Sequence, residues 1–198
     1  MNTRIILAGV LGGIAMFIWT SIAHMVLPLG EAGVREIPNE AAVISVLQTN
    51  LGNTRGLFLF PWPGLGPNPT REAKSEAMKH MGEKVAANAS GFLMYHPPGR
   101  PLNMGALLGT EFATELLESL LVVFLLAQTR LTTFGGRLGF ITVAGILAAI
   151  ATNVSYWNWY GFPKRYTAAY MFIQLVGFFV VGLVAAMAFR NTRPASGQ

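Results

Sequence analysis

The chain has 198 residues, of which 53% are hydrophobic and 12% are charged. Soluble domains carry about 25% charged residues, so this composition favours a protein of the lipid bilayer, where charge is costly. The net charge is +5, but Lys and Arg are scattered and form no stripe, which argues against nucleic acid as a partner. The sequence has no Cys, which excludes disulfides, thiol catalysis and thiolate metal sites.

Four apolar runs are long enough to cross a hydrocarbon core of ~30 Å as helices. They cover residues 5–27, 103–128, 137–157 and 167–189. The first run is too long for a typical cleaved signal peptide, so we expect an uncleaved helix. The sequence therefore predicts a mainly α membrane protein: a bundle of four transmembrane helices with a small α+β extracytoplasmic insert between helices 1 and 2. The expected parts are 1–27, the insert 28–102, and 103–198 with helices 2–4 and a cytoplasmic tail.

The orientation follows from Lys and Arg near the short links, which gather on the cytoplasmic side. Most of them fall on one side of the predicted membrane: Arg4, Arg130, Arg137, Arg190 and Arg193. Lys164 and Arg165 lie on the other side and conflict with this rule. We expect both termini in the cytoplasm and the insert outside.

The insert shows alternating helix and strand signals. Asn39 is a candidate cap for a helix that ends near residues 50–52, and Thr70 is a candidate cap for a helix that runs to about residue 89. Residues 56–60 and 92–96 predict strands, because each is apolar and ends at prolines. We expect a two-stranded sheet covered by the two helices. Such a unit is marginal alone, so it should rest on the outer helix ends or on a partner.

The second span contains Glu111, Glu115 and Glu118, which fall within roughly 60° of one another on a helix. A carboxylate at this depth costs several kcal/mol unless it is protonated, hydrated or bound to a cation, ~2.5–3.5 kcal/mol on insertion scales. One interpretation is structural, with protonated Glu side chains bonding between helices. The other is functional: a proton relay, or a cation or ligand site. Polar residues on other spans are candidate hydrogen-bond partners of these three Glu side chains: Asn153, Ser155, Tyr156 and Gln174.

Two histidines suggest a weak metal hypothesis. His24, near the outer end of the first span, and His96, after the second strand, could join Glu111 at a divalent cation. The sequence has no H-E-x-x-H motif and no pair of His at helical spacing, so we predict no metal site. No motif implies a cofactor or a catalytic residue.

Small residues four apart recur in or beside each span and permit close helix packing. The pairs are Gly9 and Gly13, Gly105 and Gly109, Gly135 and Gly139, and Gly182 and Ala186. They indicate packing within the bundle, or a face for a partner subunit.

An aromatic run covers residues 155–163, Ser-Tyr-Trp-Asn-Trp-Tyr-Gly-Phe-Pro, at the outer boundary of the third span. Aromatic residues anchor helices at that level, so anchoring is one interpretation. A ligand pocket is the other. Its candidate residues are Asn153, Tyr156, Trp157, Asn158 and Trp159.

Four local sequences carry a resemblance to a known family. They are His24 to Glu31 (HMVLPLGE), Pro38-Asn39-Glu40, Tyr95-His96-Pro97 and the aromatic run 155–163. The chain resembles a family of bacterial four-helix integral membrane proteins of unknown function. The resemblance implies a bacterial source, hence the inner membrane, and the same four-span plan, with no activity to transfer.

Three functions remain open from the sequence. The first is an accessory or structural subunit of a larger membrane complex, with partner subunits or further copies of this chain in the lipid bilayer. The second is a small proton- or cation-linked transporter or relay that uses the three Glu residues. The third is a membrane enzyme or ligand binder with a site between the insert and the outer helix ends. The lack of a catalytic set favours a protein that is not an enzyme.

Overall fold

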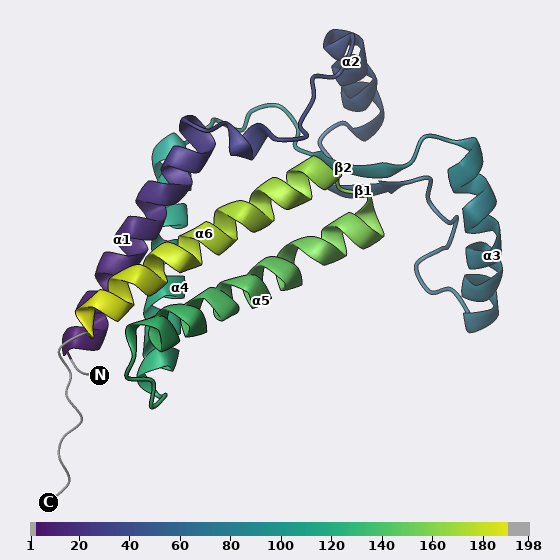
Figure 1. Cartoon of the computed structure of the whole chain (residues 1–198). Coiled ribbons are helices and arrows are strands. Elements are labelled where there is room, and N and C mark those ends of the chain that lie inside the picture. The colour runs from purple at the N-terminus through teal and green to yellow at the C-terminus, as the bar shows by residue number, and fades with distance from the viewer. Residues whose placement is uncertain (1–2, 190–198) are drawn as a thin grey trace, which may run out of the picture. The chain divides into compact units, whose positions relative to one another are not determined.

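The computed structural model describes residues 3–189 (Figure 1). Over that range the chain forms six α-helices, one short 3-10 turn and one two-stranded sheet. Contacts divide the chain into two units, Met1–Val34 with Asn103–Gln198, and Arg35–Leu102. Arg190 and Arg193, used above for the orientation, lie outside the described residues.

The first unit contains four long helices: α1 (Thr3–Met25), α4 (Met104–Ala127), α5 (Phe134–Tyr160) and α6 (Lys164–Ala188). Three of them, α1, α5 and α6, are long and apolar enough to cross a membrane. Helix α4 has 24 residues, but every stretch of 18 residues within it contains Glu111, Glu115 and Glu118. Length and composition therefore support three spans directly, and the role of α4 depends on how these carboxylates are accommodated.

Local signals explain where the helices begin and end. The Asn103 side chain accepts a hydrogen bond from the Ala106 amide at 3.0 Å, and the Thr133 hydroxyl accepts one from the Gly136 amide at 3.1 Å. Helix α5 begins three residues before the expected start and continues to Tyr160, so most of the aromatic run is helical. It ends at Gly161, which adopts a left-handed conformation with φ of 69°.

By their main contacts the four helices form a row in the order α4, α1, α6, α5. In Figure 1, α4 is partly hidden behind the other helices. Helix α1 packs on α4 and α6, and α5 packs on α6, whereas α4 meets α5 and α6 in few places. We call the end where α1 finishes and α4 begins the insert end, and the opposite end, with the link 128–133, the linker end. The buried core contains Ala8, Met16, Val122, Val123, Leu126, Ile141, Phe178, Val181 and Ala185.

The second unit has the expected order of helix, strand, helix and strand. Its elements are α2 (Glu40–Leu51), β1 (Gly56–Phe60), α3 (Arg71–Ala87) and β2 (Gly91–Tyr95). The strands pair antiparallel, from Gly56 opposite Tyr95 to Phe60 opposite Gly91. Thr70 caps α3 as predicted, with its hydroxyl accepting from the Ala73 amide. Asn39 precedes α2 but makes no side-chain capping bond, because it adopts a left-handed conformation with φ of 55°.

The expected helix cover over the sheet is wrong. Helices α2 and α3 contain no buried residue, and Tyr95 is the one buried side chain in the fully described range 35–102. The Tyr95 hydroxyl donates a hydrogen bond to the Gly52 carbonyl oxygen at 3.0 Å, which joins β2 to the end of α2. A unit with so little buried apolar surface needs support from outside itself.

Candidate functional site: a carboxylate row on helix α4

The three carboxylates of α4 lie in three different environments. Glu115 is buried, with 3% of its surface exposed, whereas Glu111 is exposed and Glu118 is partly buried. The midpoint of α4 falls between Glu115 and Leu116. In a membrane-spanning α4, the buried Glu115 would therefore lie near the middle of the bilayer, with Glu111 ~6 Å closer to the insert end.

Glycines on α1 allow α4 to approach closely enough to bury Glu115. A Cβ atom added at Gly13 would lie 2.8 Å from the Leu116 Cα atom, and one at Gly9 would lie 3.0 Å from the Leu120 Cα atom. Only glycine fits at such distances, since the neighbouring atoms belong to the backbone of α4. The prediction that Gly9 and Gly13 pack within the chain is thus confirmed.

One oxygen atom of the buried carboxyl is left without a partner. Thr20 of α1 is buried and interacts with the Glu115 side chain, and the Thr20 hydroxyl also donates to the Phe17 carbonyl oxygen at 3.1 Å. Glu115 Oε2 has no hydrogen-bond partner within residues 3–189. Buried polar atoms are nearly always paired, so this oxygen marks a place where a proton or a ligand is required.

An aromatic and polar cluster lies on the insert-end side of Glu115. The rings of Tyr166 and Tyr170 on α6 stack at 4.2 Å, and the His24 ring meets Tyr170 edge-on at 5.9 Å. Glu111 is close enough to Tyr170 to interact with it electrostatically. His24 Nδ1 lies 2.9 Å from the Thr20 carbonyl oxygen. The structure therefore brings His24 and Glu111 to the same side of the helix row, as the sequence suggested.

The sequence reasoning missed Thr20, Tyr166 and Tyr170. A usable signal was present, because Thr20 precedes His24 by four residues and Tyr166 precedes Tyr170 by four residues. Residues at this spacing share one helix face. Nothing local indicated that the two faces meet across α1 and α6.

The amide side chains expected to face the carboxylates bond to each other instead. The Asn153 amide donates to Gln174 Oε1 at 3.3 Å, and the Thr152 hydroxyl donates to the same oxygen at 3.0 Å. This group joins α5 to α6, so it lies away from the contact between α1 and α4.

The aromatic candidates of α5 are exposed and do not enclose a pocket with the carboxylates. Trp157, Asn158 and Trp159 are exposed at the insert end of α5. Tyr156 contacts the rings of Tyr160 and Phe162 at 5.7 and 5.4 Å. Whether these residues anchor the helix at the bilayer surface or meet a ligand stays a prediction.

The weak metal hypothesis gains no support. His24 and Glu111 belong to the first unit and His96 to the second. Over its described residues, neither unit brings three His or Glu side chains together in a group that could hold a metal ion.

Small residues divide into packed and open groups. Gly182 packs against Leu138 and Ile141, which confirms its predicted role within the helix layer. In contrast, a Cβ atom added at Gly109, Gly135 or Gly139 would meet no other side chain or helix within 4 Å among the described residues, and one at Gly105 would meet only the capping Asn103 side chain of its own helix.

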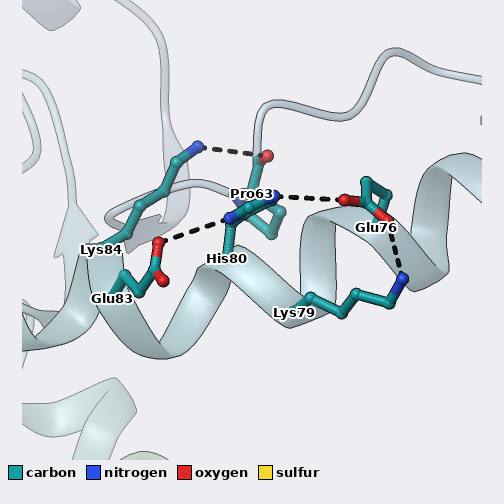
Figure 2. Close-up of polar contacts among 6 residues, drawn as sticks. All are labelled: Pro63, Glu76, Lys79, His80, Glu83 and Lys84. Carbon is teal, nitrogen blue, oxygen red and sulfur yellow. Dashed lines mark hydrogen bonds and ion pairs between the residues drawn. The ribbon is translucent and has the colours of Figure 1, made fainter.

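A second polar cluster lies on the exposed face of α3 (Figure 2). His80 Nε2 lies 3.2 Å from Glu76 Oε1 and His80 Nδ1 lies 3.4 Å from Glu83 Oε2, while Lys79 pairs with Glu76 at 2.9 Å. The bonds from Lys79 and His80 lower the pKa of Glu76, and the bonds to Glu83 and Glu76 raise the pKa of His80. All these groups are exposed, so His80 lies at the solvent-facing surface of α3 and not in an enclosed site.

Comparison with protein families, with curated proteins and with solved structures found no match for this chain.

Proposed function

We propose that this chain is a four-span protein of a bacterial inner membrane and an accessory subunit of a larger membrane assembly. Helix α4 would be the fourth span and the face that meets the partner. Membership of the bacterial four-helix family that the sequence resembles belongs to the same proposal, as do cytoplasmic termini and an insert on the outer side.

The uneven covering of the α4 carboxylates carries this proposal. The chain's own helices bury Glu115 but leave Glu111 exposed and Glu118 partly exposed. An uncovered carboxyl in the hydrocarbon region costs several kcal/mol, on the order of 2.5–3.5 on insertion scales, and such residues normally face protein or water. A partner helix beside α4 would provide that cover.

Two further features support a partner subunit. Among the described residues, a Cβ atom added at Gly109 would meet nothing within 4 Å, and one at Gly105 would meet only the Asn103 side chain of its own helix. This face of α4, roughly opposite to Glu111 and Glu118, would allow another helix to approach closely. The second unit, Arg35–Leu102, buries Tyr95 alone and exposes Leu57, Trp62 and Met94 by more than half of their surface. An assembly that covers these side chains would supply the apolar contacts that the unit lacks by itself.

Site-specific crosslinking from the membrane, at native expression, tests the proposal. A photoreactive residue at Leu108 of α4 should crosslink to another protein chain, whereas one at Leu147 of α5 should react mainly with lipid. These two positions are a matched pair, because both are exposed leucines within long helices. Equal crosslinking from both, together with a monomeric protein after mild solubilisation, would exclude an assembly that covers α4.

The Oε2 atom of Glu115, unpaired among the described residues, favours a second function, a proton relay. Glu115 Oε2 is buried and finds no partner in the described part of the chain, so the carboxylate row is a candidate proton relay. In this case Glu118→Gln should abolish proton-linked activity in reconstituted vesicles and leave the protein folded. Unchanged proton movement in that variant would exclude a relay through the row.

A further inference from the structure

We infer that Glu115 holds a single proton and that this proton exchanges only through the insert end of the helix row. The inference rests on the relay proposed above and adds to it the occupant and the side of access.

The surroundings of Glu115 suit a proton better than a metal cation. A hard cation such as Ca²⁺ takes ~6–8 oxygen ligands. Among the described residues, no group of three His or Glu side chains surrounds Glu115, and its Oε2 atom has no hydrogen-bond partner. A proton on the carboxyl removes its charge and needs no further ligand, so it is the occupant that this site accommodates.

Apolar packing closes the path towards the linker end. Beyond Ser119, the buried side chains of α4 are Val122, Val123 and Leu126. They pack in the core with residues from the other three helices: Ala8, Ile141, Val181 and Ala185. After Glu118, α4 contains no titratable residue up to its end at Ala127, so a proton finds no carrier on that helix in this direction.

Polar groups lead in the opposite direction, towards the insert end. On α1, the Thr20 side chain interacts with Glu115. The backbone carbonyl oxygen of Thr20 lies 2.9 Å from His24 Nδ1. On α4, Glu111 interacts with Glu115, and it also interacts with Tyr170 of α6. Tyr170 in turn stacks on Tyr166.

Most titratable groups around Glu115 lie on its insert-end side, and Glu118 lies one turn towards the linker end. Those facing it or adjoining it are His24 from α1, Glu111 and Glu118 from α4, and Tyr170 from α6. The cationic groups of α1 and α5 in the described range, Arg4 and Arg137, lie at the linker end, beyond the apolar core. Exposed Glu111 is therefore the natural entry group for a proton, and Glu118 is the carboxyl nearest the linker end.

Labelling with a hydrophobic carbodiimide tests the inference, because this reagent modifies protonated carboxyls in apolar surroundings. The full-length protein is placed in oriented vesicles, with orientation checked by protease cleavage of the insert, and the pH is set separately on each side. Mass spectrometry should find the adduct on Glu115. Raising the pH on the insert-end side should reduce labelling, by about tenfold per pH unit once the carboxyl is mostly ionised. Raising the pH on the linker side should change nothing.

Variants separate this inference from the relay and from simple misfolding. Glu115→Gln should lose the adduct and keep the thermal unfolding midpoint, whereas Glu118→Gln should keep the adduct on Glu115. If labelling changes with the pH on the linker side, the proton does not exchange only through the insert end. Absence of any adduct on Glu115 in the folded protein would contradict the claim that Glu115 is protonated. If the adduct behaves as expected but vesicles show no proton movement, the relay fails and the one-sided proton site stands.

Discussion

Ser119 on α4 donates a hydrogen bond of 2.8 Å to the carbonyl oxygen of Gly9 on α1, and both residues are buried. The bond spans 110 positions in sequence and lies one turn from Glu115. It fixes the rotation of α4 against α1, and this rotation determines which of the three carboxylates is covered.

Removing this bond should loosen the contact between α1 and α4 without breaking it. Ser119→Ala is expected to lower the free energy of unfolding by about 0.5–1.5 kcal/mol, because the Gly9 oxygen keeps its place in the helix and loses one donor. Thermal unfolding in detergent measures the effect. Thr142→Ala is the control, since that hydroxyl bonds within its own helix, to the Leu138 oxygen. A larger loss in the control would contradict the interpretation.

The close approach at Gly13 should tolerate no added methyl group. In Gly13→Ala the new Cβ atom would lie 2.8 Å from the Leu116 Cα atom, so the two helices must separate. We expect a loss of about 1–3 kcal/mol in unfolding free energy, measured by the same thermal unfolding. Gly139→Ala, at a position with open space in the described chain, should be neutral or slightly stabilising. Similar losses in both variants would show that helix separation is not the cause.

The open glycine face of α4 should matter for assembly and not for folding. Gly109→Leu adds a side chain where the described chain leaves open space, so the unfolding midpoint should stay nearly unchanged. If a partner helix packs there, the amount of co-purified partner should fall by roughly tenfold or more, which corresponds to ~1.4 kcal/mol of binding. Quantitative mass spectrometry of the purified assembly gives this ratio. An unchanged ratio would place the partner elsewhere.

Arg137 should hold the linker end together. Its side chain is buried, donates to the carbonyl oxygens of Leu131 and Phe189, and lies 5.7 Å from the centre of the Phe189 ring. Arg137→Met keeps the length of the side chain and removes these bonds, so the unfolding free energy should fall by roughly 1.5–3 kcal/mol or more. Faster proteolysis at the link 128–133 would report the same loosening. Arg130→Met, at an exposed position, is the control.

The polar cluster of α3 should make that helix depend on pH. The pKa of His80 is raised in the folded chain, so its contribution is present below the ordinary His value of 6.5 and is lost as the pH rises through the folded value. The pKa of Glu76 is lowered, so its contribution is present above 4.5 and is lost as the pH falls through its folded value. Hydrogen exchange in α3 should therefore be slowest between about pH 4.5 and 6.5, after correction for intrinsic rates.

A titration of the His80 ring by NMR checks this prediction directly. The double variant Glu76→Gln with Glu83→Gln should bring the pKa of His80 back towards its ordinary value, because both carboxylates raise it. Glu72→Gln, on the same helix, should leave the His80 titration as it is. Identical titrations in all three proteins would exclude the proposed pairing.

The sequence by itself determined the local elements of this protein. The bounds of β1 and the capping role of Thr70 depend on neighbours only a few residues away, so they can be predicted from the chain. The long apolar helices follow from composition in the same way. Asn39 is the exception, since its left-handed backbone removed the capping bond that its residue type suggested.

Only the tertiary structure decided which carboxylate is buried and what lies beside it. Glu111, Glu115 and Glu118 share a helix face, and no local signal distinguishes them. The contact of Gly9 and Gly13 with α4 selects Glu115, because burial depends on where a distant helix packs. The helix order α4, α1, α6, α5 is also a matter of packing between distant helices. It brings His24 to Tyr170 and keeps Asn153 away from the three carboxylates of α4. Packing between distant segments is a non-local choice, and this choice defines the candidate site.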